Sequence, residues 1–188
     1  VIATDKTGTL TRNEMTVTGI ATAAGYIEVS GAGYAPLGEF RHADQVIDPE
    51  LHGDLREIVR AGVLCNDAHL EQNESGWQPH GDPMEAALLS VARKAELDTE
   101  RVQAELPRTD AIPFESQHRF MATLHHDHAG HAFIFVKGAP EQLLEMCGRQ
   151  RLNGEDCALD PRYWHEQMQR MGERGQRLLA VAFTRARA

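Results

Sequence analysis

The sequence has little of what several common protein classes require. Its three cysteines, Cys65, Cys147 and Cys157, are odd in number and lack Cys-x-x-Cys spacing, so neither a disulfide framework nor a zinc site is predicted. This cysteine usage fits a reducing compartment such as the cytoplasm. No apolar run approaches the roughly 18 to 20 residues of a membrane-spanning helix, and no signal peptide is recognisable. The chain is therefore not predicted to cross a membrane itself.

Positive charge is also scarce. The 188 residues include 19 lysines and arginines against 28 aspartates and glutamates, which gives a formal net charge of −9. Because nucleic-acid binders need a basic surface, this class is disfavoured. Any phosphate-bearing ligand must be bound by a few locally concentrated cations. With 41% hydrophobic residues, the chain can bury the core of one ordinary domain.

The order of predicted elements favours an α+β fold, with a twisted, mostly antiparallel sheet flanked by helices. Cap-plus-proline signals at Asp48-Pro49 and Asp82-Pro83 mark two helix starts. Helices are predicted over 49–65, 83–97, 99–106, 140–146 and 161–172. Strands are predicted over 15–21, 26–29, 110–114, 119–125, 132–137 and 177–183. Loops are predicted over 31–40, 69–80 and 148–159.

The first residues carry the strongest chemical signal, Asp5-Lys6-Thr7-Gly8-Thr9-Leu10-Thr11. A carboxylate that follows an apolar run and precedes a glycine turn and hydroxyl groups suits attack on a phosphoryl group. A polar loop after a strand is the alternative interpretation. Because residues 1–3 already form the apolar run and no initiator Met precedes them, we expect the chain to be a piece of a larger protein.

The heptapeptide resembles the phosphorylation motif of P-type ATPases, ion pumps that pass through an aspartyl-phosphate. The resemblance implies that Asp5 is the phosphorylated nucleophile of the intact pump, that Lys6 and Thr7 belong to its catalytic centre, and that Asp5 and Thr7 lie at its Mg²⁺. The GYAPLGEF run at 33–40 is similar to a motif of the branch that includes calcium pumps.

Residues 81–88, GDPMEAAL, resemble a further family motif in which Glu85 accepts a hydrogen bond from the exocyclic amine of adenine. A helix N-terminus with acidic residues in its first turn is the alternative interpretation. Met84 departs from the usual Thr of the motif, which puts a hydroxyl contact there in doubt.

Residues 113–121, PFESQHRFM, are similar to the family's PFDSxRKRM. The match implies that Phe114 stacks on adenine; an aromatic core residue at a strand end is the alternative. Arg119 stands where the family has Lys and can still neutralise phosphate, although its geometry differs. His118 and Phe120 replace cations of the motif.

The KGAPE run at 137–141 resembles the most specific of these later motifs, and the match assigns Lys137 and Gly138 to ATP binding. A solvated lysine before a turn is the alternative. Arg177 leads a segment that resembles the last strand of the family's nucleotide-binding domain, where the Arg contacts the β-phosphate region. The alternative interpretation is that Arg177 is a surface charge beside an edge strand.

Taken together, the resemblance implies an ATP-binding domain of a cation-transporting P-type pump. Residues 1–14 are expected to be a fragment of the haloacid-dehalogenase-like phosphorylation domain and its hinge, and residues 15–188 the nucleotide-binding domain. Expected partners are ATP, Mg²⁺ in the intact pump, and the remaining phosphorylation, actuator and transmembrane domains. The expected location is a cytoplasmic domain of an integral membrane protein, without direct membrane contact. The fragment alone is expected to bind ATP without turnover, and the transported ion stays open among calcium, magnesium and sodium/potassium.

Two other functions remain open. A haloacid-dehalogenase-type phosphatase with a cap domain usually carries a second Asp two positions after the nucleophile as general acid, whereas this chain has Thr7 there. A non-catalytic interaction module is the third hypothesis, and it predicts no response to nucleotide at Phe114 or Lys137.

Overall fold

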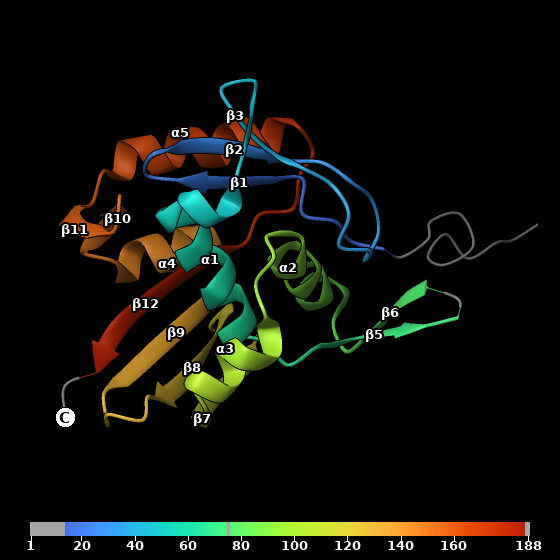
Figure 1. Ribbon diagram of the computed structural model, residues 1–188. Coiled ribbons are helices and arrows are strands. Elements are labelled where there is room, and N and C mark those ends of the chain that lie inside the picture. Colours follow the sequence, from blue (N-terminus) through green and yellow to red (C-terminus); the bar gives the residue numbers. More distant parts are fainter. Residues whose placement is uncertain (1–13, 75, 187–188) are drawn as a thin grey trace, which may run out of the picture.

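The structure of the chain is a computed structural model that describes residues 14–74 and 76–186 (Figure 1). The helices are η1 (Pro49–Leu51), α1 (Gly53–Leu64), α2 (Pro83–Lys94), α3 (Thr99–Glu105), α4 (Pro140–Met146) and α5 (Pro161–Glu173). The first six strands are β1 (Gly19–Thr22), β2 (Gly25–Val29), β3 (Phe40–His42), β4 (Gln45–Ile47), β5 (His69–Asn73) and β6 (Gly76–His80). The other six are β7 (Arg108–Glu115), β8 (Phe120–His126), β9 (Ala132–Gly138), β10 (Arg149–Leu152), β11 (Glu155–Ala158) and β12 (Ala180–Ala186).

The strands form antiparallel sheets. A central sheet has the order β12-β9-β8-β7, and an N-terminal sheet has the order β1-β2-β3-β4. Two separate hairpins, β5-β6 and β10-β11, complete the strands of the described residues. The predicted α+β class, with antiparallel strands and flanking helices, is confirmed.

Helix α1 joins the two four-stranded sheets. It contacts β1 of the N-terminal sheet, β9 and β12 of the central sheet, and helices α2 and α3 (Figure 1). Its core face includes Leu55, Val59 and Val63, which recur every four residues and are at most 4% exposed. The predicted apolar face is thus confirmed over α1. The predicted helix start is wrong, because residues 49–51 form a separate 3₁₀ turn and Leu51 is 82% exposed.

Three hairpins differ from the predictions. Residues 69–80 and 148–159 were expected to be loops, yet they contain β5-β6 and β10-β11, and no strand was expected at β3-β4. The β10-β11 turn is Asn153-Gly154 with φ values of 51° and 80°, the left-handed pair that a tight hairpin requires. The β3-β4 turn uses Ala43 and Asp44 at φ 48° and 64°, residues that give no comparable sequence signal.

Several predicted boundaries shift by a few residues. Strand β1 begins at Gly19, so the predicted strand over residues 15–21 is shorter in the structure. Strand β12 begins at Ala180, three residues after the predicted start at Arg177. The helix predicted at Pro140 has the bounds of α4, and the GYAPLGEF loop is irregular up to Phe40, where β3 starts. Within residues 14–74 and 76–186, no helix is long and apolar enough to span a bilayer.

Candidate functional site

Lys137 and Glu85 form the centre of the candidate site. Lys137 lies near the end of β9, and Glu85 lies in the first turn of α2, where the Asp82 side chain accepts hydrogen bonds from the amides of Met84 and Glu85. The Lys137 ammonium donates to Glu85 Oε1 at 2.8 Å. Their side chains are only 5% and 15% exposed. Lys137 is therefore not a solvated surface lysine, and its buried charge is compensated by a carboxylate.

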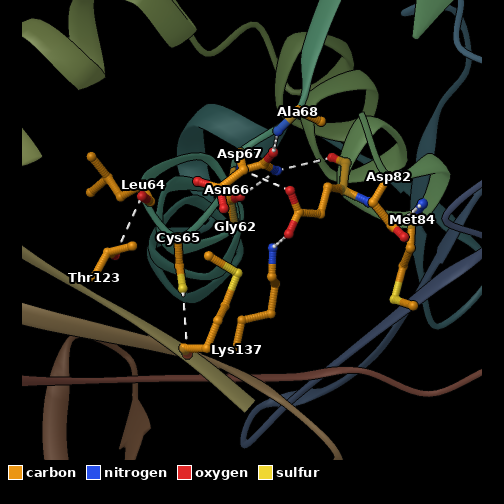
Figure 2. Close-up of polar contacts among 12 residues, drawn as sticks. Gly62, Leu64, Cys65, Asn66, Asp67, Ala68, Asp82, Met84, Thr123 and Lys137 are labelled. Carbon is orange, nitrogen blue, oxygen red and sulfur yellow. Dashed lines mark hydrogen bonds and ion pairs between the residues drawn. The ribbon is translucent and has the colours of Figure 1, made fainter. Parts of the chain in front are cut away.

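The turn after α1 holds Glu85 from the other side. The Asp67 amide donates to Glu85 Oε2 at 2.7 Å, and the Asn66 side-chain amide donates to the Glu85 carbonyl at 2.9 Å. The Asn66 side chain also donates to the Gly62 carbonyl at 3.0 Å and accepts from the Ala68 amide at 2.9 Å. In Figure 2 the Lys137 side chain points from the sheet toward this turn, where Asn66 and Asp67 lie. Both Glu85 carboxylate oxygens thus have donors in this structure.

Sequence reasoning missed Asn66 and Asp67 as members of this site. They follow a predicted helix end, and an Asn-Asp pair at that place is typical of any turn. Their contact with Glu85 spans 18 or 19 residues, and local patterns say nothing about such contacts. Arg108, at the start of β7, reaches the same turn and donates to Asp67 Oδ1 at 2.5 Å, a contact that the sequence did not predict either.

Cys65 lies beneath the same turn and packs in the core. Its thiol donates to the Met121 carbonyl at 3.7 Å, and the residue is 0% exposed (Figure 2). Burial raises the pKa of the Cys65 thiol, and the nearby Lys137 charge opposes that shift. A buried neutral thiol is a packing residue, so Cys65 offers no nucleophile to the site.

The register of the central sheet brings further predicted residues to the same end. Glu115 of β7 pairs with Phe120 of β8, and Phe120 pairs with Gly138 of β9. Phe114 therefore lies close in register to the strand end that carries Lys137. Phe114 is 59% exposed on the edge strand, so it is not a core aromatic. Arg119 occupies the turn between β7 and β8 with a left-handed φ of 58°.

Gly138 has a structural reason to lack a side chain. A Cβ at this position would lie 2.4 Å from the Arg119 carbonyl oxygen and 2.6 Å from Phe120 Cβ. The Ala139 amide donates to the same Arg119 carbonyl at 2.9 Å. The glycine thus permits close packing of the β7-β8 turn against the end of β9, and this packing fixes the backbone around Lys137.

Of the remaining predicted residues, only Arg177 is among those that the structure describes, and no contact brings it to this cluster. Arg177 is exposed and lies in the segment between α5 and β12. Asp5, Lys6 and Thr7 lie outside the described residues, so the structure does not address them. Among residues 14–74 and 76–186, no group of three or more His, Cys, Asp and Glu side chains is placed to hold a metal ion.

The arrangement combines four chemical groups at one end of a sheet. A largely buried carboxylate and ammonium can serve a ligand that both donates and accepts hydrogen bonds. An exposed aromatic ring offers a stacking surface, and an arginine follows it at the turn. The Lys137 ammonium has three donor hydrogens, of which the bond to Glu85 uses one.

Comparison with known proteins identifies the family. Residues 54–187 match a family model described as the P-type ATPase, cytoplasmic domain N. The chain is 42% identical over 188 residues to the cation-transporting ATPase pma1 of Synechocystis sp., which covers 97% of this chain and 21% of that protein. It is 44% identical over 162 residues to the probable cation-transporting ATPase F of Mycobacterium tuberculosis, covering 86% of this chain and 18% of that protein.

A human relative is similar over the same length. The chain is 37% identical over 189 residues to the calcium-transporting ATPase type 2C member 1 of Homo sapiens, which covers 97% of this chain and 20% of that protein. The chain thus spans about a fifth of the length of the curated relatives it matches. The resemblance inferred from the motifs is confirmed, and the chain belongs to the P-type ATPase family, as its cytoplasmic domain N.

Proposed function

We propose that this chain binds ATP at the Lys137–Glu85 site and serves as the nucleotide-binding domain of a cation-transporting P-type pump. The single observation that carries the proposal is the buried Lys137–Glu85 pair at the end of the central sheet. A lysine that is 5% exposed and has one carboxylate partner retains donor capacity for an anionic or carbonyl-bearing ligand. The match to a P-type ATPase family and to relatives named as ATPases supports ATP as the ligand.

The residues present fit a nucleotide. Phe114, 59% exposed, offers the ring on which adenine stacks, and Glu85 offers an acceptor for its exocyclic amine. Lys137, with Gly138 beside it, and Arg119 supply the positive charge that the acidic chain otherwise lacks. Arg177 is proposed to join the site at the β-phosphate. Because Glu85 Oε1 and Oε2 already have donors, the carboxylate must share one of them when ATP binds.

In the intact pump, Asp5 is the proposed nucleophile. Its carboxylate oxygen would attack the γ-phosphorus of ATP, the bond to ADP would break, and an aspartyl-phosphate would form. Mg²⁺, held by Asp5 and Thr7 beside Lys6, would offset charge during transfer. Residues 1–14 then belong to the phosphorylation domain and hinge, and residues 15–188 to the nucleotide-binding domain. The other phosphorylation, actuator and transmembrane domains complete the pump, with this domain on the cytoplasmic side.

Calorimetric titration of the 188-residue chain with ATP tests the proposal. We expect saturable binding with one site and no release of phosphate over the time of the titration. The Asp5→Asn variant should bind ATP with unchanged affinity, because nucleotide contacts lie in residues 15–188. Absence of ATP binding would favour the interaction-module hypothesis, and release of phosphate from small phosphomonoesters would favour the phosphatase hypothesis.

A further inference from the structure

We propose that Arg108 is a positioning residue of the nucleotide site: it fixes the turn over residues 64–68, and this turn fixes the Glu85 carboxylate that receives the adenine amine. The inference rests on the ATP binding proposed above and adds a residue outside the motifs that identified the site. Arg108 is the first residue of β7, the edge strand that also carries Phe114.

The Arg108 guanidinium makes three contacts with the turn. Its Nη1 donates to Asp67 Oδ1 at 2.5 Å, and its Nη2 donates to the Asn66 carbonyl at 2.5 Å and the Leu64 carbonyl at 3.4 Å. Leu64 is the last residue of α1, so the guanidinium lies at the negative end of that helix. A planar fork that grips a carboxylate and main-chain carbonyls together limits both the position and the rotation of the turn.

The same turn makes two contacts with Glu85. The Asp67 amide donates to Glu85 Oε2, and the Asn66 side chain donates to the Glu85 carbonyl. Asp67 therefore receives Arg108 on its side chain and supports Glu85 with its main chain. Arg108 and Glu85 are thus connected through Asn66 and Asp67, and a shift of these two residues is expected to change the direction of the Glu85 carboxylate.

The exposure of these side chains indicates that Arg108 contributes more to the orientation of Glu85 than to the stability of the fold. The Arg108 side chain is 30% exposed and the Asp67 side chain 60% exposed, so their ion pair lies at the surface. Exposed ion pairs contribute little to folding free energy. Glu85, by contrast, is 15% exposed and bonded on both oxygens, so its orientation depends on its neighbours. Loss of Arg108 is thus expected to affect recognition of the base more than the fold.

The test compares binding of ATP and inosine triphosphate, which has a carbonyl where adenine has its amine. For the Arg108→Met chain, calorimetry should show ATP binding weakened about three- to tenfold, the range for loss of one member of a coupled network. Inosine triphosphate binding should change less than about twofold, because its base makes no amine contact with Glu85. The Arg108→Lys chain keeps the charge without the fork, and it should give an intermediate loss of ATP selectivity.

The control is Arg101→Met, which removes an exposed pair between Arg101 and Glu105 on α3 and should alter neither affinity. If the Arg108 variants bound both nucleotides more weakly by the same factor, the role of Arg108 would be purely structural and the inference would be overturned. It would also be overturned if the variants kept the ATP selectivity of the unsubstituted chain. If the unsubstituted chain binds neither nucleotide, the proposed function itself fails. If it binds both without preferring ATP, the role assigned to Glu85 fails and this inference fails with it.

Discussion

Lys137 and Glu85 are 52 positions apart in the chain, yet the lysine ammonium and the glutamate carboxylate meet at 2.8 Å. One comes from the end of a strand and the other from the first turn of a helix. Because both side chains are largely withdrawn from solvent, each charge depends on the other. Removal of either group is therefore expected to leave a largely buried charge without its partner.

Replacement of Lys137 by Met should weaken both ATP binding and the fold. The variant keeps the length and apolar stem of the side chain but removes the ammonium, leaving Glu85 with the Asp67 amide. We expect ATP affinity to fall about 10- to 100-fold, the worth of a hydrogen bond to a charged group. The free energy of unfolding should fall by about 3–5 kcal/mol, because a largely buried carboxylate loses its ion-pair partner. Calorimetry and urea denaturation measure the two effects.

The matched control is Arg162→Met, which removes an exposed i,i+4 pair with Glu166 on α5. It should change the free energy of unfolding by less than about 0.5 kcal/mol and leave ATP binding intact. If Lys137→Met retained full affinity for ATP, Lys137 would not belong to the site.

Phe114 and Ile112 provide a paired comparison on one strand. Both lie on β7 and are similarly exposed, at 59% and 56%. Phe114→Ala should cost about 1–3 kcal/mol of ATP binding through lost stacking, with little change in stability. Ile112→Ala should leave ATP affinity within about 0.5 kcal/mol of the parent. Fluorescence or calorimetric titration distinguishes the two, and equal losses would argue against stacking on Phe114.

Gly138→Ala should destabilise the chain through steric conflict. The added methyl group would overlap the Arg119 carbonyl and Phe120 Cβ, so the β7-β8 turn must move. We expect a loss of about 1–3 kcal/mol in the free energy of unfolding, as for other overpacked sites. Gly148→Ala is the control, because a Cβ there meets nothing within 4 Å. Equal stability of the two variants would show that the turn relaxes freely.

Stability should decrease at mildly acidic pH because of His125. This residue is 2% exposed, and its ring nitrogens contact the Leu106 carbonyl at 2.7 Å and the Thr123 hydroxyl at 2.9 Å. Burial lowers the pKa of His125, the hydrogen bond to Leu106 opposes the shift, and the positive charges of Arg108 and His126 add to it.

The direction in which stability changes with pH follows from proton uptake by His125. The unfolded chain binds a proton near pH 6.5, whereas the folded chain resists it to lower pH. The contribution of His125 is therefore complete above about pH 6.5 and is lost as the pH falls toward its folded-state pKa, with a slope of at most about 1.4 kcal/mol per pH unit. Urea denaturation between pH 7.5 and 5.5 should show this slope, reduced in His125→Gln and retained in the exposed His128→Gln. If the free energy of unfolding of His125→Gln kept the same slope with pH, the pH dependence would not come from His125.

Helices with local start signals were predictable. Helices α2 and α5 each begin with a proline directly after an Asp cap, and such signals can be read from the sequence because capping involves neighbours only a few positions apart. The apolar spacing of α1 identified its core face for the same reason. The hairpins β3-β4 and β5-β6 were not predictable, because their strands are short and largely polar and do not alternate cleanly. Asn153-Gly154 did carry a turn signal that the loop prediction overlooked.

The family, the α+β class and the residue types that suit a nucleotide could be inferred from the amino-acid sequence, because motifs and helix caps consist of residues that are close together in the chain. How those residues are held depends on the folded chain. Folding buries Lys137 against Glu85, brings Asn66 and Asp67 to Glu85 and Arg108 to Asp67, and gives Gly138 a packing role. These relationships join residues 18 to 52 positions apart, and packing alone brings such residues together.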